Sequence, residues 1–97
     1  MKYTPENIKD ITRPIFKEYG VNKAILFGSY AKGHANEYSD IDIFVDSGLH
    51  GIKFFGLLED LSSKFSVLLD LIDKQDVVKN SDFEKEVNST GVVIYAA

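Results

Sequence analysis

The sequence contains no cysteine among its 97 residues. This absence excludes disulfide bonds, thiolate metal sites and cysteine nucleophiles, and it leaves the redox compartment open. The chain also lacks any apolar run close to the ~20 residues of a transmembrane helix. Charged residues interrupt the first segment, Met1–Tyr19, so no signal peptide is expected. We therefore expect a cytoplasmic protein that does not span a membrane.

No repeats, low-complexity tracts or linkers divide the chain, and its length fits one domain, residues 1–97. The formal net charge is −4. Because a basic face supplies most of the affinity for nucleic acid, this balance argues against nucleic acid as the main partner. It is compatible with a nucleotide substrate, since bound Mg²⁺ can offset both carboxylates and phosphates. Solubility alone would also explain the acidity.

Hydrophobic periodicity predicts that helices and strands intermix along the chain. A helix should begin at Thr4-Pro5, where Thr can cap and Pro suits the first turn, and should be kinked or broken near Pro14. Residues 81–84 have the S-x-x-E form of a capping box and predict another helix. The other expected elements are a strand 24–27, a short helix 30–32, a strand 40–46, a helix 54–65, a strand 67–72 and a strand 92–95. The fold class is therefore α/β or α+β, with a small mixed β-sheet and helices packed on it.

Asp40 and Asp42 lie two residues apart on the strand predicted over 40–46. Their side chains should point the same way, with Cα atoms about 6–7 Å apart, while Ile41 faces the core. Two carboxylates aimed at one point repel each other unless a hard cation lies between them, and Mg²⁺ commonly takes one or two carboxylates plus substrate phosphates. The pair is a candidate metal site, although two solvated acids on an exposed strand would have the same sequence pattern.

A tight turn, Gly28-Ser29, follows the strand predicted over 24–27. Where a strand turns into a helix, backbone N–H groups are exposed to an anion. Glycine lets the backbone approach a phosphate closely, and serine adds a hydroxyl. Taken alone, the same dipeptide also fits a strand-to-helix turn with no ligand.

A third acid, Asp70, interrupts the apolar run 67–72, which otherwise has the pattern of a central strand. Burying a carboxylate among apolar neighbours is costly unless something pairs with it. A metal ion, a salt bridge to lysine or arginine, or a strand end that reaches water would each satisfy the charge. The residues by themselves leave these three explanations open.

Taken together, these residues resemble one family. Residues 28–33 have the sequence G-S-Y-A-K-G, residues 39–42 have S-D-I-D, and Asp70 follows after an intervening helix. This order matches the G-S-x-A-x-G … S-D-x-D … D signature of the DNA polymerase β-like nucleotidyltransferase superfamily. The resemblance is strongest to the minimal nucleotidyltransferases, the MNT group, and covers nearly the whole chain.

The resemblance implies a polymerase β-like fold and a reaction in which an acceptor hydroxyl attacks the α-phosphorus of an NTP in line and releases pyrophosphate. Gly28 and Ser29 would bind the triphosphate. Asp40 and Asp42 would hold two Mg²⁺ ions, and Asp70 would complete the metal site and help to deprotonate the attacking hydroxyl. Two metal ions about 3.5–4 Å apart stabilise the attacking and leaving oxygens in such reactions.

The chain departs from the family pattern at two positions. Family members often carry arginine at the third or fifth position of G-S-x-A-x-G, where this chain has Tyr30 and Lys32. Lys32 can still meet a phosphate as a point charge. Tyr30 cannot supply positive charge, so affinity for the triphosphate should be lower or should come from elsewhere.

The resemblance also implies a partner protein. MNT proteins are typically paired with a small helical HEPN protein, often a ribonuclease toxin, and act as its antitoxin, in characterised cases by adenylylating a HEPN tyrosine. Larger members of the superfamily add a domain that holds the acceptor, and none is visible here. The acceptor is therefore expected to come with a partner, or a homo-oligomer completes the site. We expect a Mg²⁺-dependent enzyme that transfers AMP from ATP to a HEPN tyrosine.

Two alternatives stay open at this stage. A nucleotidyltransferase of the aminoglycoside type would modify a small molecule, but the missing acceptor domain argues against it. A contact-only antitoxin would bind its partner without turnover, but a purely structural domain has no physical need for three mutually repelling acids. The sequence does not identify the NTP, because no base-reading residue is recognisable.

Overall fold

The computed structural model describes residues 3–97; Met1 and Lys2, the first two residues of the predicted domain, lie outside the described residues. The elements are, in order, α1 (Pro5–Glu18), β1 (Lys23–Phe27), α2 (Gly28–Lys32), β2 (Ile41–Asp46), α3 (Ile52–Ser62), β3 (Leu69–Asp73), the 3₁₀ turn η1 (Lys74–Asp76), α4 (Asp82–Thr90) and β4 (Val92–Ala96). The strands form one sheet in the order β3-β2-β1-β4. β1 pairs antiparallel with β2 and β4, whereas β2 and β3 are parallel. The predicted mixed sheet with packed helices is confirmed.

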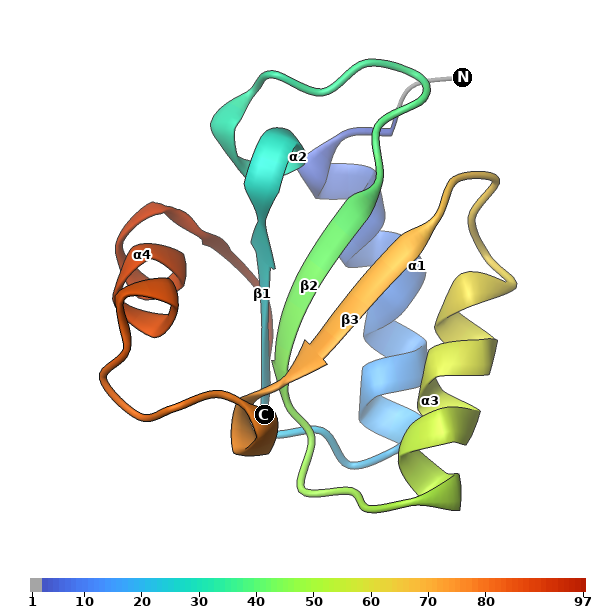
Figure 1. The fold of residues 1–97 in the computed structure, drawn as a ribbon. Coiled ribbons are helices and arrows are strands. Elements are labelled where there is room, and N and C mark those ends of the chain that lie inside the picture. Colours follow the sequence, from blue (N-terminus) through green and yellow to red (C-terminus); the bar gives the residue numbers. More distant parts are fainter. Residues whose placement is uncertain (1–2) are drawn as a thin grey trace.

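The two faces of the sheet pack against different helices (Figure 1). Ile41, Ile43 and Val45 of β2 join the core beneath α1 and α3. Phe44 points the other way and packs with Ile25 of β1, on the face that α4 covers. The alternation predicted for the segment 40–46 is therefore confirmed, except that the strand begins at Ile41.

Helix α1 begins as predicted and is not broken by its proline. The Thr4 side chain accepts a hydrogen bond from the Asn7 backbone N–H, and the Asn7 side chain accepts one from the Thr4 N–H. The expected break near Pro14 is wrong, because the helix runs on to Glu18. Pro14 is exposed, and the Thr12 hydroxyl donates to the Ile8 carbonyl at 2.8 Å within the preceding turn. No helix within residues 3–97 is both long and apolar enough to cross a membrane.

Strand β3 is an edge strand, so the prediction of a central strand over 67–72 is wrong. The strand starts at Leu69, and Leu68 before it is 75% exposed. Leu69 and Leu71 pack against the core beneath α1 and α3. Asp70 is exposed on the other face. The Asp70 carboxylate therefore reaches water, which is one of the three explanations that the sequence left open.

A buried polar network ties the ends of the two parallel strands together. Asp73, at the end of β3, is only 3% exposed. Its carboxylate accepts hydrogen bonds from the Ser47 hydroxyl at 2.7 Å and from the Gln75 side-chain amide at 2.7 Å. Ser47 directly follows β2, and its hydroxyl also accepts a bond from the Leu49 N–H at 3.0 Å. The network fixes how β2 and β3 end relative to each other.

Replacing Ser47 by alanine should destabilise the fold by about 1–3 kcal/mol, because Asp73 would lose a buried hydrogen-bond donor. The matched control is Ser63→Ala, which removes an exposed hydroxyl bonded to the Asp60 carbonyl and should change stability by less than about 0.5 kcal/mol. Urea unfolding followed by circular dichroism measures both. Equal losses in the two variants would contradict a structural role for the network.

Candidate active site

The parallel pairing of β2 and β3 places two of the three predicted acids side by side. Asp42 is the register partner of Asp70, so the two positions are separated only by the strand spacing of about 4.8 Å. Asp40 lies one residue before β2 and is exposed. All three therefore gather where β2 and β3 begin, at the end of the sheet where β1 ends.

The environment of Asp42 disfavours its charged form. Partial burial raises the pKa of its carboxyl, and the nearby negative charges of Asp70 and Asp40 raise it further. Within residues 3–97, no lysine or arginine forms an ion pair with any of the three. The negative charges of Asp70 and Asp40 thus repel that of Asp42, and no ion pair within the described residues offsets the repulsion.

The acids do not form a closed metal cage as their side chains stand. No group of three or more His, Cys, Asp or Glu side chains among the residues described is placed to hold a metal ion. The strand register places Asp42 beside Asp70, and the negative charge of Asp40 acts on the Asp42 carboxyl. Convergence of all three on one ion stays a prediction, and oxygen donors of this kind are those that Mg²⁺ prefers.

Gly28 connects the predicted phosphate turn to the acids. Its φ is +73°, a conformation that L side chains rarely adopt. A Cβ atom at this position would overlap the Asp42 carboxylate, so the backbone of the turn lies directly against the acid. Ser29 follows in the first turn of α2. The Gly28 turn and Asp42 therefore lie against each other in one site, as the sequence motif implied.

The two positions where the family often has arginine differ in what they contact. Tyr30 is 3% exposed, and its hydroxyl donates to the Asn36 carbonyl at 3.4 Å, so it belongs to the core. The Lys32 ammonium pairs with the Glu86 carboxylate of α4 at 3.3 Å. Nothing in the local sequence pointed to Glu86, because the contact joins segments 54 positions apart. A triphosphate would compete with Glu86 for this cation.

Two hollows flank the acids. One of about 140 Å³ lies between α2 and α4 and is lined by Phe27, Gly28, Lys32, Phe83, Glu86, Val87 and Thr90. The other, of about 560 Å³, is bordered by Asp40 and by the loops that precede β2 and β3. Its rim carries two exposed apolar side chains, Tyr38 at 82% and Leu68 at 75%. The site is thus open on both sides of the acid pair.

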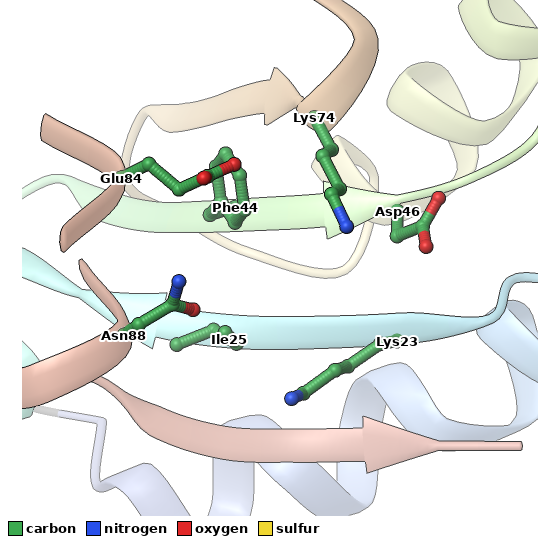
Figure 2. A pocket seen from close by; sticks show the side chains of 7 residues that line it. All are labelled: Lys23, Ile25, Phe44, Asp46, Lys74, Glu84 and Asn88. Carbon is green, nitrogen blue, oxygen red and sulfur yellow. The ribbon is translucent and has the colours of Figure 1, made fainter. Parts of the chain in front are cut away.

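A third hollow lies under α4 toward the opposite end of the same sheet face (Figure 2). Lys23, Lys74, Asp46 and Glu84 surround a floor formed by Ile25 and Phe44, and Asn88 completes the lining. Its charges are of mixed sign, and none of the predicted site residues lines it. It is therefore separate from the acids and the Gly28 turn.

Comparisons with known proteins identify the family and the fold. The family model described as "Polymerase beta, Nucleotidyltransferase" matches residues 6–97. A relative from Methanocaldococcus jannaschii, MJ1215, is 39% identical over an alignment of 80 residues that covers 76% of this chain and 93% of the relative. Protein adenylyltransferase MntA of Thermococcus cleftensis is 37% identical over 82 residues, 76% of this chain and 81% of that protein.

Solved structures share the fold. A toxin–antitoxin structure with AMP-PNP gives a TM-score of 0.71 at 23% identity, covering 92% of this chain and 73% of that one. A chain in the structure of a tri-AMPylated HEPN toxin of Shewanella oneidensis in complex with an MNT antitoxin also gives a TM-score of 0.71. Its identity is 20%, and the match covers 97% of this chain and 74% of that one. At these identities the likeness concerns the fold.

Replacing Asp42 by asparagine should leave the fold intact and raise its melting temperature at neutral pH by up to about 4 °C. The raised pKa means that ionised Asp42 opposes folding above its folded-state pKa. Below the ordinary aspartate range the acid is protonated in both states, so the advantage of the variant should vanish there. Calorimetric melts across pH test this; a large loss of stability at neutral pH would show that the carboxylate is structural.

Replacing Gly28 by alanine should destabilise the protein by about 1–3 kcal/mol more than Gly33→Ala does. Both glycines have positive φ, at +73° and +76°, but only Gly28 has a neighbour where the Cβ would lie, namely Asp42. The excess should disappear in an Asp42→Ala background, which removes the overlapping carboxylate. Urea unfolding of Gly28→Ala and Gly33→Ala, each with and without Asp42→Ala, gives the four free energies of unfolding that are compared. An excess that persists without the carboxylate would disprove the contact.

Proposed function

The chain belongs to the polymerase β nucleotidyltransferase family and to its minimal, MNT group, and we propose that it transfers AMP from ATP to a tyrosine hydroxyl of a HEPN-type partner protein, for which it is the antitoxin. The observation that carries the proposal is the register that sets Asp42 beside Asp70, directly against the Gly28 backbone. We place this reaction in the cytoplasm, where ATP and Mg²⁺ are available.

Asp40, Asp42 and Asp70 are the residues that would hold two Mg²⁺ ions. The fit rests on the donor set, three carboxylates that form no ion pair with a basic residue in residues 3–97. Partial burial and the charges of Asp70 and Asp40 raise the pKa of Asp42. Divalent cations would remove the repulsion that the apo protein carries. When bound, they supply charge neutralisation at the phosphates and at the attacking and leaving oxygens.

Gly28, Ser29 and Lys32 would bind the triphosphate. The absence of a Cβ at Gly28 leaves its backbone open to a phosphate beside Asp42, and Ser29 offers a hydroxyl and an N–H at the first turn of α2. Lys32 is exposed, and its one ion pair within residues 3–97 is with Glu86, an exposed pair of the kind that contributes about 0–1 kcal/mol. A triphosphate can therefore displace Glu86 at small cost.

In the proposed step, the tyrosine oxygen of the partner forms a bond to the α-phosphorus of ATP. The bond from that phosphorus to the oxygen bridging to the β-phosphate breaks, and pyrophosphate leaves. Asp70, exposed at the edge strand, accepts the proton of the attacking hydroxyl. The product is an AMP–tyrosine phosphodiester on the partner.

The open site supports a protein acceptor. In-line attack requires the attacking oxygen at roughly 3–3.5 Å from phosphorus, and holding it there contributes several kcal/mol. The hollow beside Asp40 has exposed apolar residues on its rim and no enclosing wall that would hold a small acceptor. A folded partner can supply the missing orientation. Two comparisons support a protein acceptor. One relative is named protein adenylyltransferase MntA, and one structure of similar fold contains a tri-AMPylated HEPN toxin.

The direct test incubates the chain with ATP, Mg²⁺ and the product of the neighbouring gene, followed by mass spectrometry. Wild type should add AMP to the partner, and Asp42→Asn should reduce the rate at least about 100-fold, since it removes a ligand required in the transition state. The matched control is Asp46→Asn, on the same strand and the same face but at its far end. It should transfer AMP at the rate of wild type.

Metal dependence has a readout separate from turnover. Calorimetry with a non-hydrolysable ATP analogue should show binding that requires Mg²⁺ and is lost with EDTA, and Asp40→Ala/Asp42→Ala should abolish the metal-dependent part. Metal-independent binding would contradict the assigned acids. If the partner is fully inhibited while remaining unmodified, transfer is refuted and a contact-only antitoxin takes its place.

A further inference from the structure

A groove with only basic charges lies on the face of the sheet opposite the acids. It runs between α1 and β4, has a volume of about 480 Å³, and is lined by Lys9, Arg13, Lys17, Val93, Ile94, Tyr95, Ala96 and Ala97. The chain as a whole is acidic, with a net charge of −4. A groove lined by three cationic side chains and no acidic side chain therefore departs from the average surface of the molecule.

The three cations form one stripe along α1, at positions i, i+4 and i+8. Like charges at i, i+4 destabilise a helix, and the stripe contains two such pairs. Glu6 and Asp10 each stand three residues before one of these cations, yet neither forms an ion pair with it within 4 Å. Within residues 3–97 no acid forms an ion pair with the stripe, so its three exposed cations are available to an external anion.

The other wall of the groove is a free strand edge. β4 is the last strand of the sheet, bonded to β1 on one side only among the residues described. Val92 is 38% and Val93 47% exposed along it. A free edge presents backbone N–H and C=O groups to an incoming strand, which would be bound by main-chain hydrogen bonds. The edge therefore selects an extended peptide over a compact ligand.

The spacing of the cations suits a strand. Residues four apart on a helix are about 6 Å apart along its axis. Side chains on one face of a strand repeat every second residue, about 6.8 Å apart. Acids at alternate positions of a strand added to β4 would therefore face successive cations of α1. We propose that this groove binds an extended acidic segment of a partner protein, which joins the sheet beside β4 and pairs with Lys9, Arg13 and Lys17.

The same charges argue against other occupants. If a second copy of the chain paired its own β4 across this edge, the two cationic stripes would meet on one face of the joined sheet and repel each other. Nucleic acid would use the cations but leave the backbone groups of β4 without partners, and the overall negative charge of the chain would oppose it. An acidic strand would pair its carboxylates with the α1 cations and its backbone groups with those of β4.

The inference is independent of the transfer reaction. The groove lies under α1, whereas Asp42 lies on the face that carries Phe44 and α4. Variants in the groove should consequently keep Mg²⁺-dependent binding of the ATP analogue. Loss of peptide binding and loss of nucleotide chemistry are thereby separate outcomes.

The test measures fluorescence anisotropy of a labelled peptide in which glutamate alternates with threonine, a composition that favours extended structure. Wild type should bind it, and Arg13→Glu should weaken binding about tenfold or more, because it introduces repulsion at the centre of the stripe. Lys53→Glu is the matched control, the same class of charge reversal at an exposed position on α3, and should bind like wild type. A peptide with lysine in place of glutamate should not bind.

Strand addition requires a second readout. On binding of the glutamate peptide, the backbone amides of Val92–Ala96 should shift in NMR spectra and exchange more slowly with solvent. Peptide binding that leaves these amides unchanged would overturn strand addition. Equal binding by Arg13→Glu, tighter binding of a single-stranded oligonucleotide in the same groove, or a dimer through β4 in solution would each overturn the proposed occupant.

Discussion

The parallel register between β2 and β3 is the constraint on which the candidate site depends. It sets Asp42 opposite Asp70 and lets the charge of one raise the pKa of the other. A shift by one residue would turn the side chains of β3 to the other face and bury Asp70 beneath the helices. The hydrogen bonds between Asp73 and Ser47 oppose such a shift at the far end of the strands. A buried polar contact at one end thus preserves an exposed acid pair at the other.

The acid pair and the Gly28 turn depend on each other. The carboxylate of Asp42 occupies the space that a side chain at residue 28 would need, so the glycine of the motif is explained by packing as well as by its positive φ. Such a site stores electrostatic repulsion in the folded protein, in the way that functional sites commonly trade stability for activity. The fold tolerates the repulsion because the core lies mainly on the other face of the sheet, beneath α1 and α3.

The sheet separates two kinds of surface. The face under α4 carries the acids, the Gly28 turn and the Lys32–Glu86 pair. The face under α1 carries the buried core and, at its margin, the cationic groove beside β4. The two surfaces therefore lie on opposite faces of the sheet.

The sequence by itself determined what local chemistry decides: the helix start at Thr4, the alternation of β2 and the Gly28 turn. Each follows from periodicity or backbone conformation within a few residues. Only the tertiary structure decided that β3 is an edge strand, so that Asp70 is exposed, and that Asp73 is buried. It also decided that Glu86 meets Lys32 and that the α1 cations border β4. The apolar run around Asp70 looked central because a run of apolar residues does not reveal how many neighbours its strand has. The Lys32–Glu86 contact and the approach of the α1 cations to β4 join segments far apart in the chain. Such contacts depend on strand order and register, which no local pattern encodes.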